Sequence, residues 1–536
     1  MELAAEQEQA LVEQARKLNS YHGLMYYYLA RGQSRRVRDL ECGNVTDSLT
    51  KDLILGAEDP GGPARLAERG LEGASDAWLY YGLAKLLLRA GRVEGALRVA
   101  VQRLEAAPHD GSVLNLIGRS LVAQRDYALA GEVLNRSLAR NPFQEDVKRL
   151  VERLDAGDPP RAEVRLDLAP RPAPVCFYVP VYNVEAFIRQ AIEGILAQHH
   201  PVAEILVIDD GSEDGSIDLA REYPVSIIEH AANRGLAAAR NTAFRRASCG
   251  LLAAIDTDAR PDPGYAKYAL MEFENGDETL GGVGGMLVEQ HTDSLPDAWR
   301  ARHLAQHWGD VRLCPPNFLF GSNSVFRKEA VLDVGGYDER YRTNAEDAEL
   351  CVRLRDRGYD LCYTPAAKAY HLRRDTLESL LRTRWNYEFW YRHAHGFLTD
   401  LAAVVAHLDD LLDAAMAFVH KDLADDETRF LYVDLLTFFY DVLASAAYGV
   451  EHGAVASSEG RWLQDSVLGV LGQLDVPTRD ALHKRVSQHL GQLLIDAQPV
   501  PPPSSDIAQQ LHRDLSGVRA RLGELSPAFF RILSPS

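Results

Sequence analysis

The sequence predicts an α/β domain, with a mostly parallel sheet flanked by helices, between two all-helical regions. In the middle of the chain, short apolar runs alternate with helical stretches, which is typical of a parallel sheet with helices on its faces. Before and after that region, the apolar residues follow helical spacing. At 536 residues the chain is also longer than one hydrophobic core usually supports, so several domains are expected.

Composition narrows the class of protein. The formal charge of −19 disfavours nucleic-acid binding through a basic face. The acidic N-terminus does not resemble a signal peptide, and no apolar stretch approaches the ~20 uninterrupted residues of a membrane span. We therefore expect a cytoplasmic protein without a transmembrane segment, for which contact with a membrane surface stays open. The six cysteines form no CxxC pair, so scattered reduced thiols are expected.

Residues 1–154 are predicted to be helical and to contain an internal repeat. Three positions correspond to three others 34 residues later: Gly91, Ala96 and Pro108 to Arg125, Ala130 and Pro142. This is the period of the tetratricopeptide helix–turn–helix unit. Two copies are fewer than such arrays usually need, so either residues 1–73 hold degenerate copies or the repeats lean on the next domain. A protein-binding surface is the favoured role, and bracing of the neighbouring domain is the alternative.

Composition also sets the remaining domain boundaries. Residues 155–173 are rich in proline and charge and are predicted to be a linker. The α/β domain is expected at 174–375, followed by a helical domain at 376–497. A Pro/Ser spacer and a terminal helix complete the chain at 498–536.

Polar residues follow several of the predicted strands, where ligands bind in open α/β sheets. They stand after three separate apolar runs: Tyr182 and Asn183, then Asp209 and Asp210, then Asp256 and Asp258. Carboxylates that converge in this way repel one another unless a cation lies between them. A hard divalent cation such as Mg²⁺ or Mn²⁺ binds one or two carboxylates and completes its shell with waters and phosphates. The pattern therefore predicts a metal that holds a diphosphate.

The motifs of this region occur in a familiar order: "VPVYNVEAFIRQ", "EILVIDDGSEDGS", "NRGLAAARNTAF", "IDTDARPDPGY", "FGSNSVF" and "NAEDAEL". As a set they resemble the family 2 glycosyltransferases, which are inverting enzymes with a GT-A fold and nucleotide-sugar donors. The resemblance covers roughly residues 174–375.

The resemblance implies a donor site and a metal site. Its residues fall into successive groups along the chain: Pro180, Tyr182 and Asn183 at the nucleotide pocket, with Tyr182 near the base; Asp209 or Asp210 accepting from the uracil N–H; Asn233, Gly235, Arg240 and Asn241 beside the ribose and diphosphate; and Asp256 facing the ribose or sugar. Asp258 would bind the metal, and His371 matches a further metal ligand. A structural histidine is the alternative for His371.

The resemblance also implies a catalytic acidic pair, Glu346 and Asp347. Inversion needs a base that takes the proton from the acceptor hydroxyl. Asp347 is the predicted base, and Glu346 would hold acceptor or structure. An acidic first helical turn, favoured by the helix dipole, is the compatible alternative. The metal would compensate the charge of the leaving diphosphate.

For two further residues, the resemblance implies a role in substrate binding less strongly. Arg384, with Trp385, faintly resembles the QxxRW element of polysaccharide synthases and could touch the diphosphate. The core face of an amphipathic helix is the alternative. Asn323 lies in "FGSNSVF", which resembles the acceptor-side strand of the family, and could contact a sugar or a peptide there.

Other enzyme classes lack their signatures here. The first strand is not followed by GxGxxG, and no Walker A motif is present. A non-catalytic scaffold is the alternative from another class, although the acidic and histidine positions are intact. For the acceptor, helical repeats before a transferase domain resemble bacterial enzymes that glycosylate proteins, including flagellins. The repeats therefore favour a protein acceptor. A transferase that builds a surface polysaccharide or glycolipid at the cytoplasmic membrane face is the alternative.

Overall fold

A computed structural model describes residues 12, 25, 34–40, 45–56, 71, 76–158, 174–276, 278–395, 400–471 and 505–524. The chain forms two compact units. The first contains Met1–Gln290, Gln306–Glu339 and Glu346–Arg373, and the second contains His291–Ala305, Arg340–Ala345 and Arg374–Ser536. The predicted repeat region and sheet domain thus share one unit. Most of the predicted linker and of the Pro/Ser spacer lies outside the described residues.

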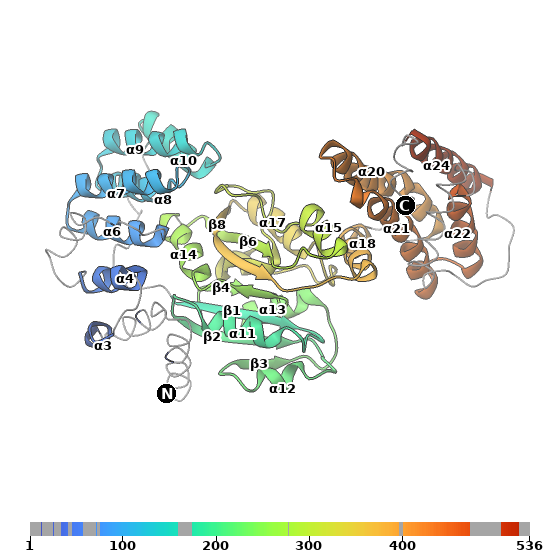
Figure 1. The fold of residues 1–536 in the computed structure, drawn as a ribbon, viewed down its shortest axis with the longest axis horizontal. Helices are drawn as coiled ribbons and strands as arrows, with labels where there is room; N and C mark the ends of the chain where they lie inside the picture. The colour runs from blue at the N-terminus through green and yellow to red at the C-terminus, as the bar shows by residue number, and fades with distance from the viewer. Residues whose placement is uncertain are drawn as a thin grey trace. The chain divides into compact units, whose positions relative to one another are not determined.

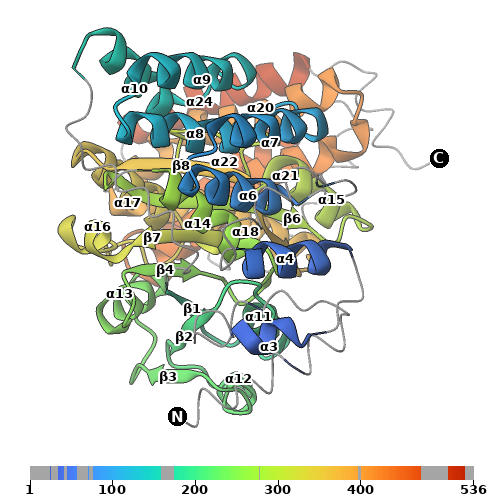
Figure 2. The same ribbon diagram turned by 90° about the vertical axis from the view of Figure 1, so that its left-hand side faces the viewer.

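The N-terminal part of the first unit is helical. Its helices are α3 (Ser34–Arg38), α4 (Val45–Gly56), α6 (Ala77–Arg89), α7 (Val93–Ala106), α8 (Ser112–Ala123), α9 (Tyr127–Arg140) and α10 (Glu145–Asp155). Figure 2 shows α6, α7, α8 and α9 stacked in layers, in agreement with their contacts. Helices α7 and α9 begin at Val93 and Tyr127, which reproduces the predicted 34-residue offset.

A small residue lets the second helix pair pack closely. A Cβ at Gly118 would lie 2.4 Å from Cδ2 of Leu134. Ala130, on the facing helix, is fully buried. Aspartate side chains also cap the N-termini of two of these helices. Asp76 accepts from the Trp78 N–H, and Asp126 accepts from the Leu129 N–H. The predicted degenerate copies in residues 1–73 lie mostly outside the described residues.

An eight-stranded sheet follows, in the order β3-β2-β1-β4-β7-β6-β8-β5 (Figure 1). The strands are β1 (Val175–Val181), β2 (Val202–Asp209), β3 (Ser226–Glu229), β4 (Leu251–Ala254), β5 (Ala259–Pro261), β6 (Leu280–Glu289), β7 (Ser324–Arg327) and β8 (Asp360–His371). Strands β1 to β4 pair in parallel, as do β6 and β8, whereas β7 and β5 pair antiparallel to their neighbours. The predicted α/β class is confirmed, with a mixed, mostly parallel sheet.

Helices cover both faces of this sheet. They are α11 (Ile188–Leu196), α12 (Ser216–Ala220), α13 (Leu236–Arg246), α14 (Tyr265–Asn275), α16 (Lys328–Asp333) and α17 (Glu346–Asp356). Strand β1 is buried throughout, and its alternate side chains enter different cores. Phe177 packs in a cluster with residues of α11 and α14, whereas Tyr178 packs with residues of α13 and α17. This is why the strand appears in the sequence as a continuous apolar run.

The repeat helices pack directly on α14. The Tyr81 hydroxyl donates to Oδ1 of Asn275 at 3.1 Å. The largely buried guanidinium of Arg312 pairs with Asp146 of α10 and Glu272 of α14, at 3.1 and 2.8 Å. Burial alone would raise the pKa of Asp146, but Arg312 and Arg119 lower it to about 2. The bracing role that the sequence left open is therefore present in these contacts.

Four cysteines form two pairs. Cys176 and Cys249 are disulfide-bonded, as are Cys314 and Cys362. The expectation of scattered reduced thiols is wrong for these four residues. Nothing in the sequence indicated these pairs, whose members are 73 and 48 residues apart. The members of the first pair come together because β1 pairs with β4 in the sheet. Cys351 is a buried free thiol.

The second unit is helical. Its helices are α15 (Leu295–His303), α18 (Leu377–Ala394), α19 (Leu401–Ala406), α20 (Leu408–Ala424), α21 (Leu431–Glu451), α22 (Ser457–Leu471) and α24 (Ser505–Glu524). Helix α21 provides more residues of the apolar core than any other helix of this unit. Among the described residues, only Thr428–Glu451 is long and apolar enough to cross a membrane, and 89% of its most apolar 18-residue window is buried in the protein. A buried core helix passes the same test, so this is weak evidence for a span.

Helix α15 packs in a different unit from the one that its position in the sequence suggests. The segment His291–Ala305, which contains α15, lies between β6 and β7 in the chain but packs in the second unit. Trp299 of α15 forms a cluster with Leu380, Phe430 and Val433. This segment therefore belongs with the C-terminal helices, although it lies before the domain boundary predicted at residue 375.

Candidate active site

Sheet pairing brings Asp258 and His371 together. Asp256 and Asp258 follow β4, and the short strand β5 begins at the next residue, Ala259. Ala259 pairs with His371, the last residue of β8. As a result, Oδ2 of Asp258 lies 3.3 Å from Nε2 of His371. Two residues 113 positions apart in the chain thus face each other. Both were named as metal ligands by the family resemblance, and that role stays a prediction.

A third residue, Glu289, completes this group. It ends β6 in parallel register with His371, and its Oε1 lies 2.9 Å from Nδ1 of the imidazole. Burial by itself lowers the pKa of His371, but Asp258 and Glu289 outweigh burial and raise it to about 9. The sequence analysis missed Glu289. Its only signal was a carboxylate at the end of the apolar run "GGMLVE", the relation that singled out Asp209.

The donor set fits a divalent cation. Metal-binding histidines usually give one ring nitrogen to the ion and the other N–H to a carboxylate, which fixes the ring. His371 has this arrangement, with Glu289 at Nδ1 and Asp258 at Nε2. Asp258 is about one-third exposed at its side chain, whereas His371 is buried. A carboxylate and an imidazole nitrogen are therefore available on the open side.

Arg240 of α13 connects the other predicted carboxylates. Its buried guanidinium donates to Oδ1 of Asp256 at 3.0 Å and to Oε1 of Glu346 at 3.2 Å. It also donates to the Tyr178 hydroxyl and the Gly321 carbonyl. This position differs from that of an arginine that reaches out to a phosphate, since four of the five donors of its rigid fork are already engaged inside the protein.

Glu346 and Asp347 begin α17 as predicted, and the structure separates their environments. Glu346 is 2% exposed. Burial and the neighbouring Asp347 raise its pKa to about 8, although Arg240 acts in the opposite direction. Asp347 is only partly buried. Its Oδ2 accepts from the Gly321 N–H at 2.7 Å, and its Oδ1 accepts from the Ala348 N–H at 2.8 Å.

Gly321 allows this close approach. A Cβ at this position would lie 2.7 Å from Nη2 of Arg240 and 3.4 Å from Cβ of Asp347. The glycine begins a short 3-10 helix, Gly321–Asn323, which precedes β7. Together, Arg240 and Gly321 fix the positions of Asp256, Glu346 and Asp347 relative to one another.

On the predicted nucleotide side, two loops after neighbouring strands bind each other. Pro180 is buried in β1, and Tyr182 beyond it is 49% exposed. The Asn183 N–H donates to Oγ of Ser212, and its side chain accepts from the Glu213 N–H. Asp209 ends β2 and accepts from the Ser212 N–H at 2.9 Å. The Tyr182 ring therefore lies exposed beside a loop pair that these hydrogen bonds hold together.

Asp210 instead stabilises the turn into α13. Its carboxylate accepts from the Gly235 N–H at 2.7 Å and from the Arg234 N–H, and it contacts Nδ1 of His230 at 2.7 Å. Gly235 has φ of +98°, a conformation that favours glycine. Asn233, two residues before it, is partly buried. These bonds occupy Asp210, so Asp209 is the better placed of the two aspartates.

Asn323 and Arg384 have different surroundings. Asn323 is fully buried, and among the described residues neither atom of its amide group has a hydrogen-bond partner. Arg384 of α18 lies in the second unit, where its buried guanidinium pairs with Asp441 of α21. Because Asp441 already neutralises this arginine, the alternative of a helix core face describes it.

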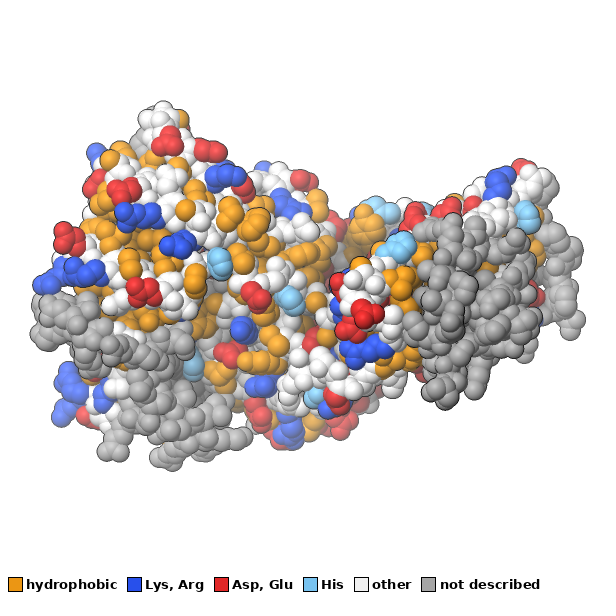
Figure 3. Space-filling model, turned by 45° about the horizontal axis from the view of Figure 1, so that its top comes forward, with side chains coloured by type: hydrophobic (Ala, Val, Ile, Leu, Met, Phe, Trp, Pro, Cys, Tyr) orange, Lys and Arg blue, Asp and Glu red, His pale blue; other side chains and the backbone are white. Residues whose placement is uncertain are grey.

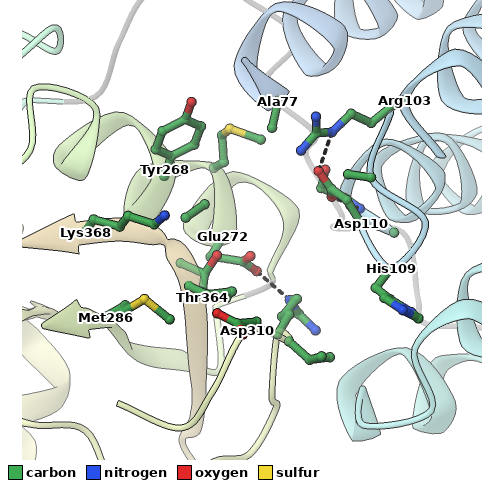
Figure 4. A pocket seen from close by; sticks show the side chains of 18 of the residues that line it. Ala77, Arg103, His109, Asp110, Tyr268, Glu272, Met286, Asp310, Thr364 and Lys368 are labelled. Atoms are coloured by element: carbon green, nitrogen blue, oxygen red, sulfur yellow. Dashed lines mark hydrogen bonds and ion pairs between the residues drawn. The ribbon is translucent and has the colours of Figure 1, made fainter. Parts of the chain in front are cut away.

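A separate cavity of about 360 Å³ lies between the repeat helices and the sheet domain. Arg103, Asp110, Glu272 and Lys368 are among its lining residues (Figure 4). Most of its charges pair with each other or with neighbours, since Arg103 bonds to Asp110 at 2.6 Å and Glu272 bonds to Arg312 at 2.8 Å. The predicted site residues do not line it.

Residues 176–335 match the family model described as Glycosyl transferase family 2. Poly-beta-1,6-N-acetyl-D-glucosamine synthase of Staphylococcus aureus (strain COL) is 28% identical over 222 residues, covering 39% of this chain and 53% of the relative. Probable glycosyltransferase YdaM of Bacillus subtilis (strain 168) is 25% identical over 234 residues, covering 39% and 54%. The chain thus spans about half the length of these curated relatives.

Solved structures are similar at a lower level. The crystal structure of S. aureus TarS 1-349 in complex with UDP-GlcNAc has a TM-score of 0.32 and 14% identity, covering 59% of this chain and 92% of that one. The mannosyltransferase PcManGT from Pyrobaculum calidifontis, in complex with GDP-Man and Mn²⁺, has a TM-score of 0.33 and 16% identity, covering 66% and 86%. Likenesses at this level carry no argument about function.

Proposed function

We propose that the family 2 glycosyltransferase domain of this chain transfers a sugar from a nucleoside-diphosphate donor to an acceptor hydroxyl, with inversion, in a metal-dependent reaction. One observation carries the proposal. A carboxylate–imidazole–carboxylate group, Asp258, His371 and Glu289, lies in the same domain as a second carboxylate group that Arg240 holds together. The first group suits the binding of a cation, and the second group suits proton transfer. The proposed reaction needs both.

Asp258 and His371 would hold Mn²⁺ or Mg²⁺, and Glu289 would orient the imidazole. When bound, the ion would stabilise the negative charge that develops on the departing diphosphate. Asp256 would face the ribose or the sugar, with its carboxylate fixed by Arg240 at 3.0 Å. Tyr182, Asn183 and Asp209 would bind the nucleoside, which we propose to be uridine on the basis of the family resemblance.

Asp347 is the proposed base. It would take the proton of the acceptor hydroxyl as that oxygen attacks the anomeric carbon and the bond from this carbon to the diphosphate oxygen breaks. Each of its oxygens accepts one backbone N–H and keeps a lone pair for the acceptor. Glu346 is less suited, because it is buried and its pKa of about 8 favours the protonated form at neutral pH. Its proposed role is to hold Arg240.

For the acceptor, a sugar hydroxyl on a growing glycan is the favoured candidate. The named activity of the Staphylococcus relative is polysaccharide synthesis. A protein acceptor, such as a flagellin held by the repeats, is the second candidate. It is supported by the helix pairs with their 34-residue offset, although one side of these pairs is covered by α14. On the face in Figure 3, acidic and basic side chains are interspersed with hydrophobic ones. A cytoplasmic location is part of this proposal.

The test is an assay of nucleoside diphosphate release by the purified full chain, with Mn²⁺ and a panel of nucleotide sugars. Asp258→Ala and Asp347→Asn should each abolish release, while Asp218→Asn, at an exposed carboxylate of α12, should not. Calorimetry should show that Asp347→Asn still binds the nucleotide and that Asp258→Ala has lost the metal dependence of binding. If neither turnover nor metal-dependent binding occurs with any donor, the scaffold alternative replaces the enzyme.

Acceptor classes can be compared in the same assay. Oligosaccharides, lipid-linked saccharides and folded bacterial surface proteins would be added separately to the active donor. Stimulation by a saccharide alone supports the glycan acceptor. Stimulation by a protein alone supports the second candidate and overturns the first.

A further inference from the structure

Three titratable side chains meet inside the second unit, where the glycosyltransferase motifs have no part. His303 ends α15, Asp422 lies near the end of α20, and Asp434 lies in the first turn of α21. Both aspartates are completely buried, and the His303 side chain is 1% exposed. One ligand atom from each of the three residues lies within 4.8 Å of the others. Three separate helices thus direct a nitrogen and two oxygen donors to one point.

The charges at this point are incompletely compensated. Asp422 pairs with Arg302, which also reaches the exposed Asp425. Oδ1 of Asp434 accepts from Nε1 of Trp299 at 2.7 Å. Oδ2 of Asp434 is buried, and no donor in the described part of the chain reaches it. A buried carboxylate without a cation is costly, so this oxygen is available for one.

The surroundings of His303 favour a neutral imidazole. Its ring lies 4.7 Å from that of Trp299 and 4.9 Å from that of Phe418, measured between centroids. Such an apolar enclosure disfavours a charged ring. The neutral imidazole is the form that binds metals. Nε2 lies 2.9 Å from Oδ2 of Asp422, so the two donors already face the same point.

We propose that His303, Asp422 and Asp434 form a structural binding site for a divalent transition-metal cation, with Zn²⁺ as the best match. Zinc accepts histidine nitrogen and carboxylate oxygen at about 2.0–2.2 Å, which places tetrahedral ligands about 3.3 Å apart. The donor spacing here requires only small side-chain movements to reach that arrangement. With Zn²⁺ bound, two positive charges would join Arg302 and balance Asp422, Asp425 and Asp434.

The proposed ion would join α15 to the C-terminal helices. Helix α15 belongs in sequence to the segment between β6 and β7, yet it packs against α20 and α21 through Trp299 and His303. A metal held by all three helices would fix that attachment. The competing arrangement is a shared proton, in which a neutral Asp434 donates to Asp422 and no ion binds.

The two arrangements predict different effects of Asp434→Asn on zinc binding. The metal arrangement predicts that the variant loses zinc that its parent binds, and the shared proton predicts that neither protein binds it. An asparagine amide can donate to Asp422 as a protonated aspartate would, so the metal-free variant should remain folded in either case. Metal binding, in contrast, needs the carboxylate. Even outer-shell changes weaken metal affinity by about 10–100-fold, so loss of a direct ligand should cost at least about 100-fold.

The experiment uses the full chain with Asp258→Ala, which removes the proposed catalytic metal site. Reductant is omitted so that Cys314 and Cys362 stay disulfide-bonded and offer no thiolate to zinc. The protein would be stripped with EDTA, desalted, titrated with Zn²⁺ and analysed for bound zinc and for the midpoint of thermal unfolding. We expect one tight zinc per chain and a raised midpoint. Adding Asp434→Asn or His303→Gln should remove both, while His420→Gln, at an exposed residue of α20, should keep them.

Either of two results would overturn the proposal. One is the absence of tight zinc from the Asp258→Ala protein. The other is unchanged zinc affinity after Asp434→Asn, in which case the ion is held elsewhere. A metal-free Asp434→Asn protein that is as stable as its parent, together with no zinc in either, would establish the shared proton. These results are independent of glycosyl transfer, because the readouts are metal content and unfolding.

Discussion

Nδ1 of His371 lies 2.9 Å from Oε1 of Glu289, at the ends of two strands that run side by side in parallel register. Glu289 and Asp258 together raise the pKa of His371 to about 9, so without a cation both ring nitrogens carry protons at neutral pH. Nε2 faces Oδ2 of Asp258, 3.3 Å away. In the proposed metal site a cation would displace the proton of Nε2, and Glu289 would keep that of Nδ1 and orient the ring.

Replacement of this carboxylate should weaken metal binding selectively. In Glu289→Gln the side-chain oxygen can still accept from Nδ1–H, but the negative charge is lost. We expect the Kd for Mn²⁺ to rise about 10–100-fold, as for other outer-shell changes. Titration followed by electron paramagnetic resonance measures this, with Glu229→Gln at the exposed end of β3 as control. An unchanged Kd in Glu289→Gln would show that the contact has only a structural role.

Gly321 should be intolerant of even one methyl group. The added Cβ of Gly321→Ala would displace Arg240 and press on Asp347, and a misplacement of about 1 Å can cost about 100-fold in rate. We expect kcat to fall by about that factor while the Kd of the donor stays within a few-fold. Gly250→Ala is the matched control, because nothing lies within 4 Å of its added Cβ. Equal kcat values for the two variants would contradict the proposed role of this contact.

Glu346 should make stability depend on pH. Its pKa rises from 4.5 to about 8 on folding, chiefly through burial. The folded protein therefore holds a proton that the unfolded chain releases, so the free energy of unfolding falls as pH rises from about 4.5 through about 8. Glu346→Gln should flatten this fall. Urea unfolding of the metal-free protein at pH 5 and pH 8.5 measures it.

The control for this measurement is Glu329→Gln, at an exposed glutamate in the first turn of α16. Its pH dependence should match that of the parent protein. If Glu346→Gln also matches the parent, Glu346 is ionised in the folded state across this range.

The attachment of the repeat helices should depend on Arg312. Arg312→Ala leaves the buried carboxylate of Glu272 without its cation and leaves Asp146 with Arg119 alone. Breaking a buried pair typically costs about 3–5 kcal/mol. Arg149→Ala, which breaks a more exposed pair with Asp360, should cost less than about 1 kcal/mol. Chemical unfolding measures both, and similar small losses would show that the interface rests on apolar packing alone.

Several features of this protein follow from the sequence because they depend on neighbours in the chain. A strand buried on both faces needs a continuous apolar run, and β1 shows it. Parallel strands end at a common edge, so Asp256 and Asp258 could be placed there from their position after β4. The 34-residue offset of the helix pairs was likewise visible, since a repeated unit repeats its small and apolar residues.

Tertiary structure decided what depends on residues far apart. Glu289 reaches His371 only through the pairing of β6 with β8, and Arg240 reaches Glu346 across 106 residues. Likewise, α15 joins the C-terminal helices through Trp299, although its sequence lies between two strands of the sheet. Local patterns determine which side chains are buried and how each segment folds. Which buried groups become partners is determined by the packing of whole elements, because charge compensation and close packing act between surfaces that the chain order does not encode.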